Sequence, residues 1–159
     1  MIKVLIVYWS KSGNTERMAK AVAEGVKKSG EEAVLQRVEE TKPEDLSQAD
    51  GIIIGSPTYC GSMVPQIKEL IDSCDKYHGQ LKGKVGGAFT SSGNIGGGGE
   101  TAILSIIHAF LIYGMIVQGN PSYDSGHFGP IAIFSPDERA LKECKELGNR
   151  VIELIRKLK

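Results

Sequence analysis

The sequence has no excess of either charge and no apolar run long enough to cross a membrane. It contains 19 Lys and Arg against 19 Asp and Glu, so its net charge is zero. A nucleic-acid-binding face would need a basic excess, and we expect no such partner. The apolar run from Val4 to Trp9 is too short and too β-branched for a signal peptide or a membrane span.

Cysteine is also scarce, with only Cys60, Cys74 and Cys144 in 159 residues. The number is odd, and the spacings fit no zinc-binding pattern. These cysteines are therefore expected to be reduced thiols, which predicts a cytoplasmic protein without a metal site. The length suits one domain covering residues 1–159.

Glycine is the one abundant residue type, at 20 positions. Much of it lies in 93–99 and 114–129, which marks these segments as loops. Elsewhere, short apolar runs alternate with stretches of helical periodicity. The runs are continuous rather than alternating, as in strands that are covered on both faces. The predicted strands are 4–7, 51–54, 85–89 and 115–117, with an edge strand at 33–38 and a continuation of the last strand at 131–134.

Apolar stripes predict helices between these strands, around 18–26, 64–74 and 103–110, and a last helix up to Leu158. At the start of the last helix, Ser135 is expected to be the N-cap, with Pro136 in the first position and Glu138 completing a capping box. Regular alternation of strand and helix predicts an α/β fold with a parallel sheet.

Three of the predicted strands end in loops of small hydroxyl residues and glycine. Ligands bind beyond the carboxyl ends of strands in such folds, so the same chemistry at three strand ends indicates one site. The loops are Ser10, Lys11, Ser12, Gly13, Asn14 and Thr15; then Pro57, Thr58, Tyr59, Cys60 and Gly61; then Ser91, Ser92, Gly93, Asn94, Ile95, Gly96 and Gly97.

The first loop is typical of a phosphate cradle. It opens a helix, so free amides and the positive end of the helix dipole face the ligand. Lys11 precedes Gly13, so this is not the triphosphate loop, and the dinucleotide fingerprint is absent as well. The alternative for this loop alone is a capped helix with a serine-rich turn.

The second loop offers an aromatic side chain, Tyr59, and the third offers mostly backbone groups. A phosphate site at one end and a planar heterocycle at the other describe a mononucleotide, and the aromatic favours a flavin. Taken alone, Tyr59 is as consistent with a surface tyrosine. Trp9 is expected to pack near the phosphate loop or shield it, and contacts of Cys60 or His127 with the ligand stay open.

With these motifs, the chain resembles the flavodoxin family over its whole length. The segment Ser10 to Thr15 matches the flavodoxin phosphate signature, and 55–63, 91–101 and 114–117 are similar to the WrbA-type NAD(P)H:quinone oxidoreductases. The resemblance implies a three-layer αβα sandwich with a five-stranded parallel sheet of order 2-1-3-4-5. It further implies a noncovalent FMN, with phosphate contacts from the first loop and ring contacts from the other two.

The resemblance leaves the type of oxidoreductase open. An electron carrier with a protein redox partner is favoured by the short chain and the flavodoxin-like first loop. An NAD(P)H-dependent quinone or flavin reductase is favoured by the neutral charge and the single aromatic, which leaves one flavin face open. A non-redox binding module is a weaker third reading, and a homo-oligomer is compatible with all three.

Overall fold

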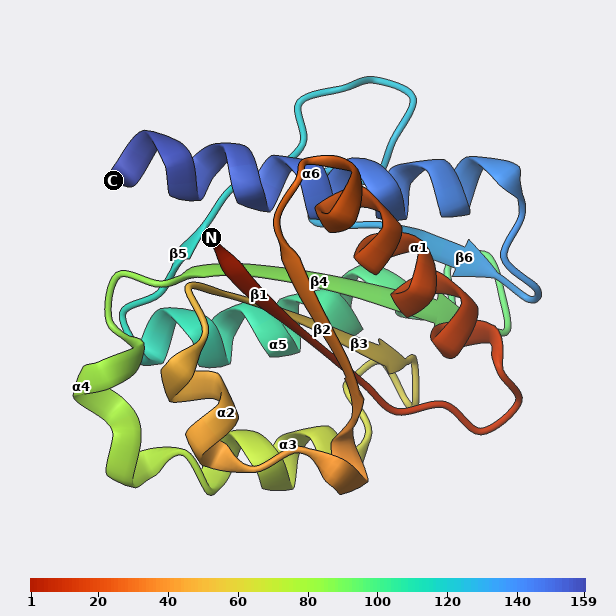
Figure 1. Cartoon of the computed structure of the whole chain (residues 1–159). Helices are drawn as coiled ribbons and strands as arrows, with labels where there is room; N and C mark the ends of the chain where they lie inside the picture. The colour runs from red at the N-terminus through yellow and green to blue at the C-terminus, as the bar shows by residue number, and fades with distance from the viewer.

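The computed structural model describes all 159 residues as one twisted parallel sheet with helices on both faces (Figure 1). The strand order is β2-β1-β3-β4-β5, and β6 also pairs with β4, so the predicted fold is confirmed. The strands are β1 (Lys3–Tyr8), β2 (Glu32–Arg37), β3 (Gly51–Pro57), β4 (Val85–Ser92), β5 (Ile116–Val117) and β6 (Ile131–Ile133).

The apolar strands divide their side chains between two cores, one on each face of the sheet. On β1, Leu5 and Val7 face one core, whereas Val4 and Ile6 face the other, and all four are fully buried. A sheet covered on both faces needs apolar residues at every position, which is why these runs do not alternate with polar residues.

Helices α1 and α6 cover one face of the sheet, and α2 to α5 supply the other core (Figure 1). None of the helices is both long and apolar enough to cross a membrane. The helices are α1 (Asn14–Lys28), α2 (Pro43–Gln48), α3 (Pro65–Asp72), α4 (His78–Leu81), α5 (Gly99–Ile112) and α6 (Glu138–Leu158), with 3-10 turns at Val38–Glu40 and Asp75–Tyr77. The sequence pattern missed α2 and α4, because so few residues cannot display a period.

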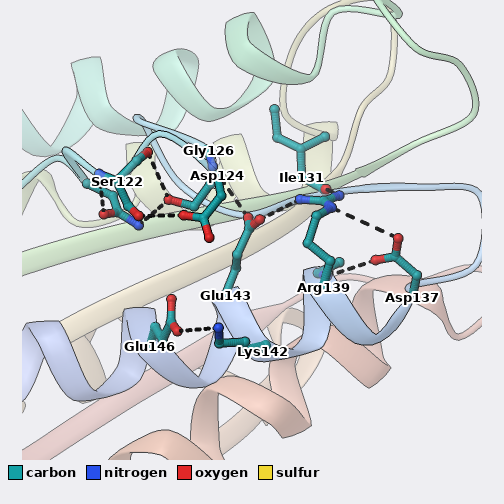
Figure 2. Close-up of polar contacts among 12 residues, drawn as sticks. Ser122, Asp124, Gly126, Ile131, Asp137, Arg139, Lys142, Glu143 and Glu146 are labelled. Carbon is teal, nitrogen blue, oxygen red and sulfur yellow. Dashed lines mark hydrogen bonds and ion pairs between the residues drawn. The ribbon is translucent and has the colours of Figure 1, made fainter.

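The predicted continuation of the last strand is present as β6, and it follows a long connection from β5 that is bonded to α6. Figure 2 shows how this connection is anchored. Glu143 of α6 is only 5% exposed; it pairs with Arg139 at 2.5 Å and accepts the amide of Gly126 at 3.4 Å. Arg139 also donates to the carbonyl of Ile131 at 3.0 Å, which holds β6 to the helix.

The predicted start of α6 was wrong by two residues. The N-cap is Asp137, whose carboxylate accepts the amide of Ala140 at 2.8 Å, and the helix begins at Glu138. The hydroxyl of Ser135 instead accepts a hydrogen bond from Arg17 of α1 at 2.7 Å. The helix is therefore capped locally by Asp137, three residues before Ala140, while Ser135 bonds a residue 118 positions away.

Helices α1 and α6 approach each other closely through two glycines. A Cβ built on Gly25 would lie 2.0 Å from the carbonyl oxygen of Lys145, and one on Gly148 would lie 2.4 Å from that of Val22. Backbone atoms cannot yield as a flexible side chain can, so this contact excludes any side chain. It fixes α1, and therefore the loop at its N-terminus, against the longest helix.

Gly25→Ala and Gly148→Ala should each lower the free energy of unfolding by about 1–3 kcal/mol, because the helices must separate to admit the methyl group. Urea denaturation followed by circular dichroism measures this. Gly79→Ala is the matched control, because Gly79 has open space around it within α4. That change should leave stability unchanged or raise it by up to about 1 kcal/mol. Equal effects at all three glycines would contradict the close-contact argument.

Candidate functional site

The three predicted loops meet in one cleft at the carboxyl edge of the sheet. They follow β1, β3 and β4, which run parallel and therefore end at the same edge. The predicted residues that line the cleft are Ser10, Lys11, Ser12, Asn14, Thr15, Pro57, Thr58, Tyr59, Ser91, Ser92 and Gly93. The cleft has a volume of about 240 Å³.

The N-terminus of α1 opens into this cleft without a side-chain cap. Its N-cap is Gly13, at φ +94°, and no side chain accepts a hydrogen bond from the first turn. The amides of Asn14, Thr15 and Glu16 have no partner within the helix, because a helix cannot satisfy its own first amides. The other long helix on this face, α6, is capped by Asp137.

Two hydrogen bonds fix the conformation of the first loop. The hydroxyl of Ser10 accepts the amide of Gly13 at 3.0 Å, and Arg37 donates to the Ser10 carbonyl at 3.2 Å. Arg37 ends the edge strand β2, where sequence reasoning gave it no role in the site. Only the pairing of β2 beside β1 brings its guanidinium to the loop.

Glu16 places one negative charge in the first turn of α1, and two cations offset it. Lys20 lies 2.6 Å from its carboxylate and Arg37 lies 3.8 Å from it. The hydrogen bond from Lys20 lowers the pKa of Glu16, and the charges of Lys20 and Arg37 lower it further. Because both cations stay beside this carboxylate, it does not leave the helix N-terminus electronegative.

Hydroxyl groups connect the three loops to one another. Thr15 of the first loop and Ser91 of the third lie 2.9 Å apart, oxygen to oxygen. The hydroxyls of Thr58, in the second loop, and Thr90 lie 2.8 Å apart and share a hydrogen bond. The amide of Thr58 donates to the carbonyl of Ser91, also at 2.8 Å. Four of the hydroxyl residues that line the cleft are buried, namely Ser10, Thr15, Ser91 and Ser92.

The second loop contains a tight turn with two left-handed residues. Tyr59 and Ser62 exchange both backbone hydrogen bonds at 3.0 Å around Cys60 (φ +49°) and Gly61 (φ +74°). Two positive φ values in succession define the type I′ turn. A Cβ on Gly98 would lie 2.7 Å from the Cα of Gly61, so the second loop also packs directly against the start of α5.

Tyr59 is 43% exposed and is supported by an aromatic neighbour. The ring of Trp9 lies edge-on to it, with centroids 5.8 Å apart and planes at 77°. Trp9, which directly precedes the first loop, thus also supports the tyrosine of the second loop. This geometry fixes the Tyr59 ring at one side of the cleft.

Some residues of the predicted set do not line the cleft. Gly13 and Gly61 shape their loops through positive φ, and Ile95 is 89% exposed. His127 is outside the site, because its ring nitrogen bonds the carbonyl of Asn120 within the β5–β6 connection. The predicted residues outside the lining are Gly13, Cys60, Gly61, Asn94, Ile95, Gly96 and Gly97.

One lining residue comes from a fourth segment that the sequence did not reveal. Phe134, directly after β6, lines the cleft together with the three loops. The expected continuation of the last strand over 131–134 was the available signal, since a strand parallel to the others must end at the same edge. Sequence reasoning treated Phe134 as part of that strand and missed its place in the site.

A larger hollow, of about 760 Å³, lies beside α1 and α6 and has a different lining. Its walls include Glu24, Lys28, Lys145 and Arg150, and it contains no hydrophobic residue. Strand ends and helix N-termini do not converge there, so the smaller cleft remains the candidate site.

Comparisons with known proteins agree with this site. The family model described as NADPH-dependent FMN reductase matches residues 43–129. A flavodoxin from Aquifex aeolicus is 37% identical, and the alignment covers 98% of this chain and 88% of that protein. An NAD(P)H dehydrogenase (quinone) from Archaeoglobus fulgidus is 35% identical, with 99% and 100% covered.

Among solved structures, the flavodoxin, WrbA-like protein from Agrobacterium tumefaciens superposes with a TM-score of 0.83 at 28% identity, covering the whole of both chains. The sequence match, the strand order and the three-loop cleft point to the same group. The chain belongs to the flavodoxin-like FMN-binding redox proteins, which include flavodoxins, NADPH-dependent FMN reductases and quinone-reducing NAD(P)H dehydrogenases.

Proposed function

We propose that the chain holds its noncovalent FMN in the three-loop cleft and passes electrons through it as a flavodoxin-type carrier. The observation that carries the FMN site is the uncapped N-terminus of α1 beside a cleft lined by buried hydroxyls. The short chain and the flavodoxin-like first loop favour the carrier over the reductase. Free amides and hydroxyl donors at a helix N-terminus suit a phosphate dianion. The same donors would cost stability if no ligand or water satisfied them.

The phosphate end is assigned to Ser10, Lys11, Ser12, Gly13, Asn14 and Thr15. Backbone amides and hydroxyls in this loop supply the donors, and the side chain of Lys11 lines the cleft and adds a positive charge. Gly13 takes a left-handed φ that a larger residue would adopt only at a cost, so the loop can curl around an anion.

The ring end is assigned to Pro57, Thr58, Tyr59, Cys60 and Gly61, with Ser91, Ser92, Gly93, Asn94, Ile95, Gly96 and Gly97. FMN supplies a ring that can accept and return electrons one or two at a time. The chain's own residues orient that ring: Tyr59 provides a rigid aromatic surface, and the two loops provide backbone donors and acceptors for its polar edge.

A second candidate function is NAD(P)H:quinone or flavin reduction. It is favoured by the neutral net charge and by apolar side chains near the cleft, since docking between carrier proteins commonly uses complementary charge. Tyr59 and Phe134 are exposed residues of this kind. The partner of the carrier would be a redox protein; that of the reductase would be NAD(P)H and a quinone.

Two further properties belong to the proposal. A cytoplasmic location is supported by three cysteines without a disulfide. A homo-oligomer is compatible with the exposed Leu111 and Ile112 at the end of α5. Size-exclusion chromatography with light scattering measures the oligomeric state.

The purified protein should be yellow and should release FMN rather than FAD on denaturation. Riboflavin lacks the phosphate, and each charge-assisted hydrogen bond is worth about 1.5–3 kcal/mol. Riboflavin should therefore bind at least about a hundredfold more weakly than FMN. Quenching of flavin fluorescence measures both affinities. Equal affinities would refute the phosphate site.

Gly13→Ala should strongly weaken FMN binding, because the left-handed residue shapes the loop around the phosphate. Gly30→Ala is the matched control: Gly30 has φ +80°, equally open surroundings, and a place at the opposite end of α1. Both changes should cost about 1–2 kcal/mol of stability through strain, but only the first should raise the Kd for FMN. An equal loss of affinity in both variants would show a general effect of strain.

Steady-state assays separate the carrier from the reductase. A carrier, once reduced by dithionite, should pass electrons to cytochrome c, and it should oxidise NADH or NADPH with benzoquinone no faster than free FMN does. A reductase must bind the nicotinamide within about 3–3.5 Å of the ring. Rapid NAD(P)H oxidation that needs the FMN-loaded protein would therefore replace the carrier with the second candidate.

A further inference from the structure

Phe134 is an aromatic residue in an unusual position at the cleft. It lines the cleft together with residues of the three loops, yet it is 66% exposed. Its φ is +58°, in the left-handed region. Only one other non-glycine residue of the chain has a positive φ, and that is Cys60 in the second loop of the same site.

A left-handed phenylalanine is costly for the folded chain. The conformation costs about 1–2 kcal/mol for a residue with a Cβ, and bulky residues rarely adopt it. The exposed ring offsets little of this cost, because it buries little apolar surface. Glycine or asparagine would satisfy the backbone at this position better. Strain of this kind is typical of ligand-contacting residues.

Hydrogen bonds on both sides hold Phe134 in this conformation. Its amide donates to the carbonyl of Ser92 at 2.8 Å, which extends the pairing of β6 with β4. Arg17 of α1 donates to the Ser135 hydroxyl at 2.7 Å and to the Pro136 carbonyl at 3.4 Å. On the other side, Arg139 holds the Ile131 carbonyl (Figure 2). The backbone that carries the ring is therefore fixed from both sides.

Phe134 and Tyr59 enter the cleft from different sides. Tyr59 follows β3, Phe134 follows β6, and β4 lies between those two strands. The segment of Phe134 is tied to Arg17 in the first turns of α1, so it lies beside the first loop. Tyr59 is instead supported by Trp9.

We propose that Phe134 is a second aromatic wall of the FMN site, which contacts the bound cofactor from the side opposite Tyr59. This inference rests on the proposed FMN site. The buried contact with FMN is what offsets the strain and the exposure of the ring. The cleft then has an aromatic on each side, contrary to the single aromatic that the sequence indicated.

The test compares Phe134→Gly, Phe134→Asn and Phe134→Tyr with Phe128→Ala. Glycine and asparagine relieve the strain, so the FMN-free variants should melt a few degrees above the wild type. Without the ring, their Kd for FMN should rise about tenfold. Tyrosine keeps the ring and should restore the affinity. Phe128 precedes β6, is 49% exposed and lies outside the cleft lining, so its loss should leave the Kd unchanged.

Flavin fluorescence quenching gives the Kd, and thermal unfolding of the FMN-free protein gives the stability. A Kd for Phe134→Gly or Phe134→Asn equal to that of the wild type would overturn the role of Phe134 and leave the FMN site intact. A wild type that does not bind FMN would instead overturn the site itself. An equal loss of affinity in Phe128→Ala would also count against the proposal, because it would show a general effect of removing an exposed aromatic.

Discussion

The parallel direction of β1, β3, β4 and β6 is the constraint on which the rest of this structure depends. Parallel strands deliver the segments that follow them to one edge of the sheet, so four stretches far apart in the chain become neighbours. Hydroxyl groups then connect those stretches, as the Thr15–Ser91 and Thr58–Thr90 contacts show. These bonds lie at the carboxyl ends of the strands, where Thr90 and Ser91 are the last residues but one or two of β4.

Conformations that cost the chain stability, such as an uncapped helix start and positive φ values at non-glycine residues, are found at the carboxyl edge of the sheet. Helix α6 is capped by Asp137 and buries a continuous apolar stripe, whereas α1, packed against it, begins at an uncapped glycine. The two non-glycine residues with positive φ, Cys60 and Phe134, lie in segments that border the cleft. Sites that bind ligands commonly carry such costs, because groups arranged for a ligand are not arranged for the chain alone. The glycine contact between α1 and α6 keeps the uncapped end in place.

Flavodoxins and quinone-reducing dehydrogenases both match this chain over nearly its full length. A shared fold and a shared cofactor site do not separate a carrier from a reductase, because both place the same group at the same edge. A carrier and a reductase differ in the partner that approaches the flavin ring, which is a redox protein for the carrier and NAD(P)H with a quinone for the reductase. In this chain Lys11 is the one charged residue among those that line the cleft, and the exposed aromatics Tyr59 and Phe134 come from two different connections. The properties of the cleft's rim, rather than of the phosphate loop, therefore decide between the two functions.

The sequence by itself determined the α/β class, the strand order through its family resemblance, and the loops that form most of the cleft. Continuous apolar runs and hydroxyl-rich loops are local signals, and parallel topology turns them into one site. Tertiary structure alone decided the support of Tyr59 by Trp9 and the entry of Phe134 into the site. Each of these depends on a partner far away in the chain, namely Tyr59 for Trp9 and Ser92 for Phe134. No local pattern encodes such a contact, because its geometry exists only after the sheet and helices have packed.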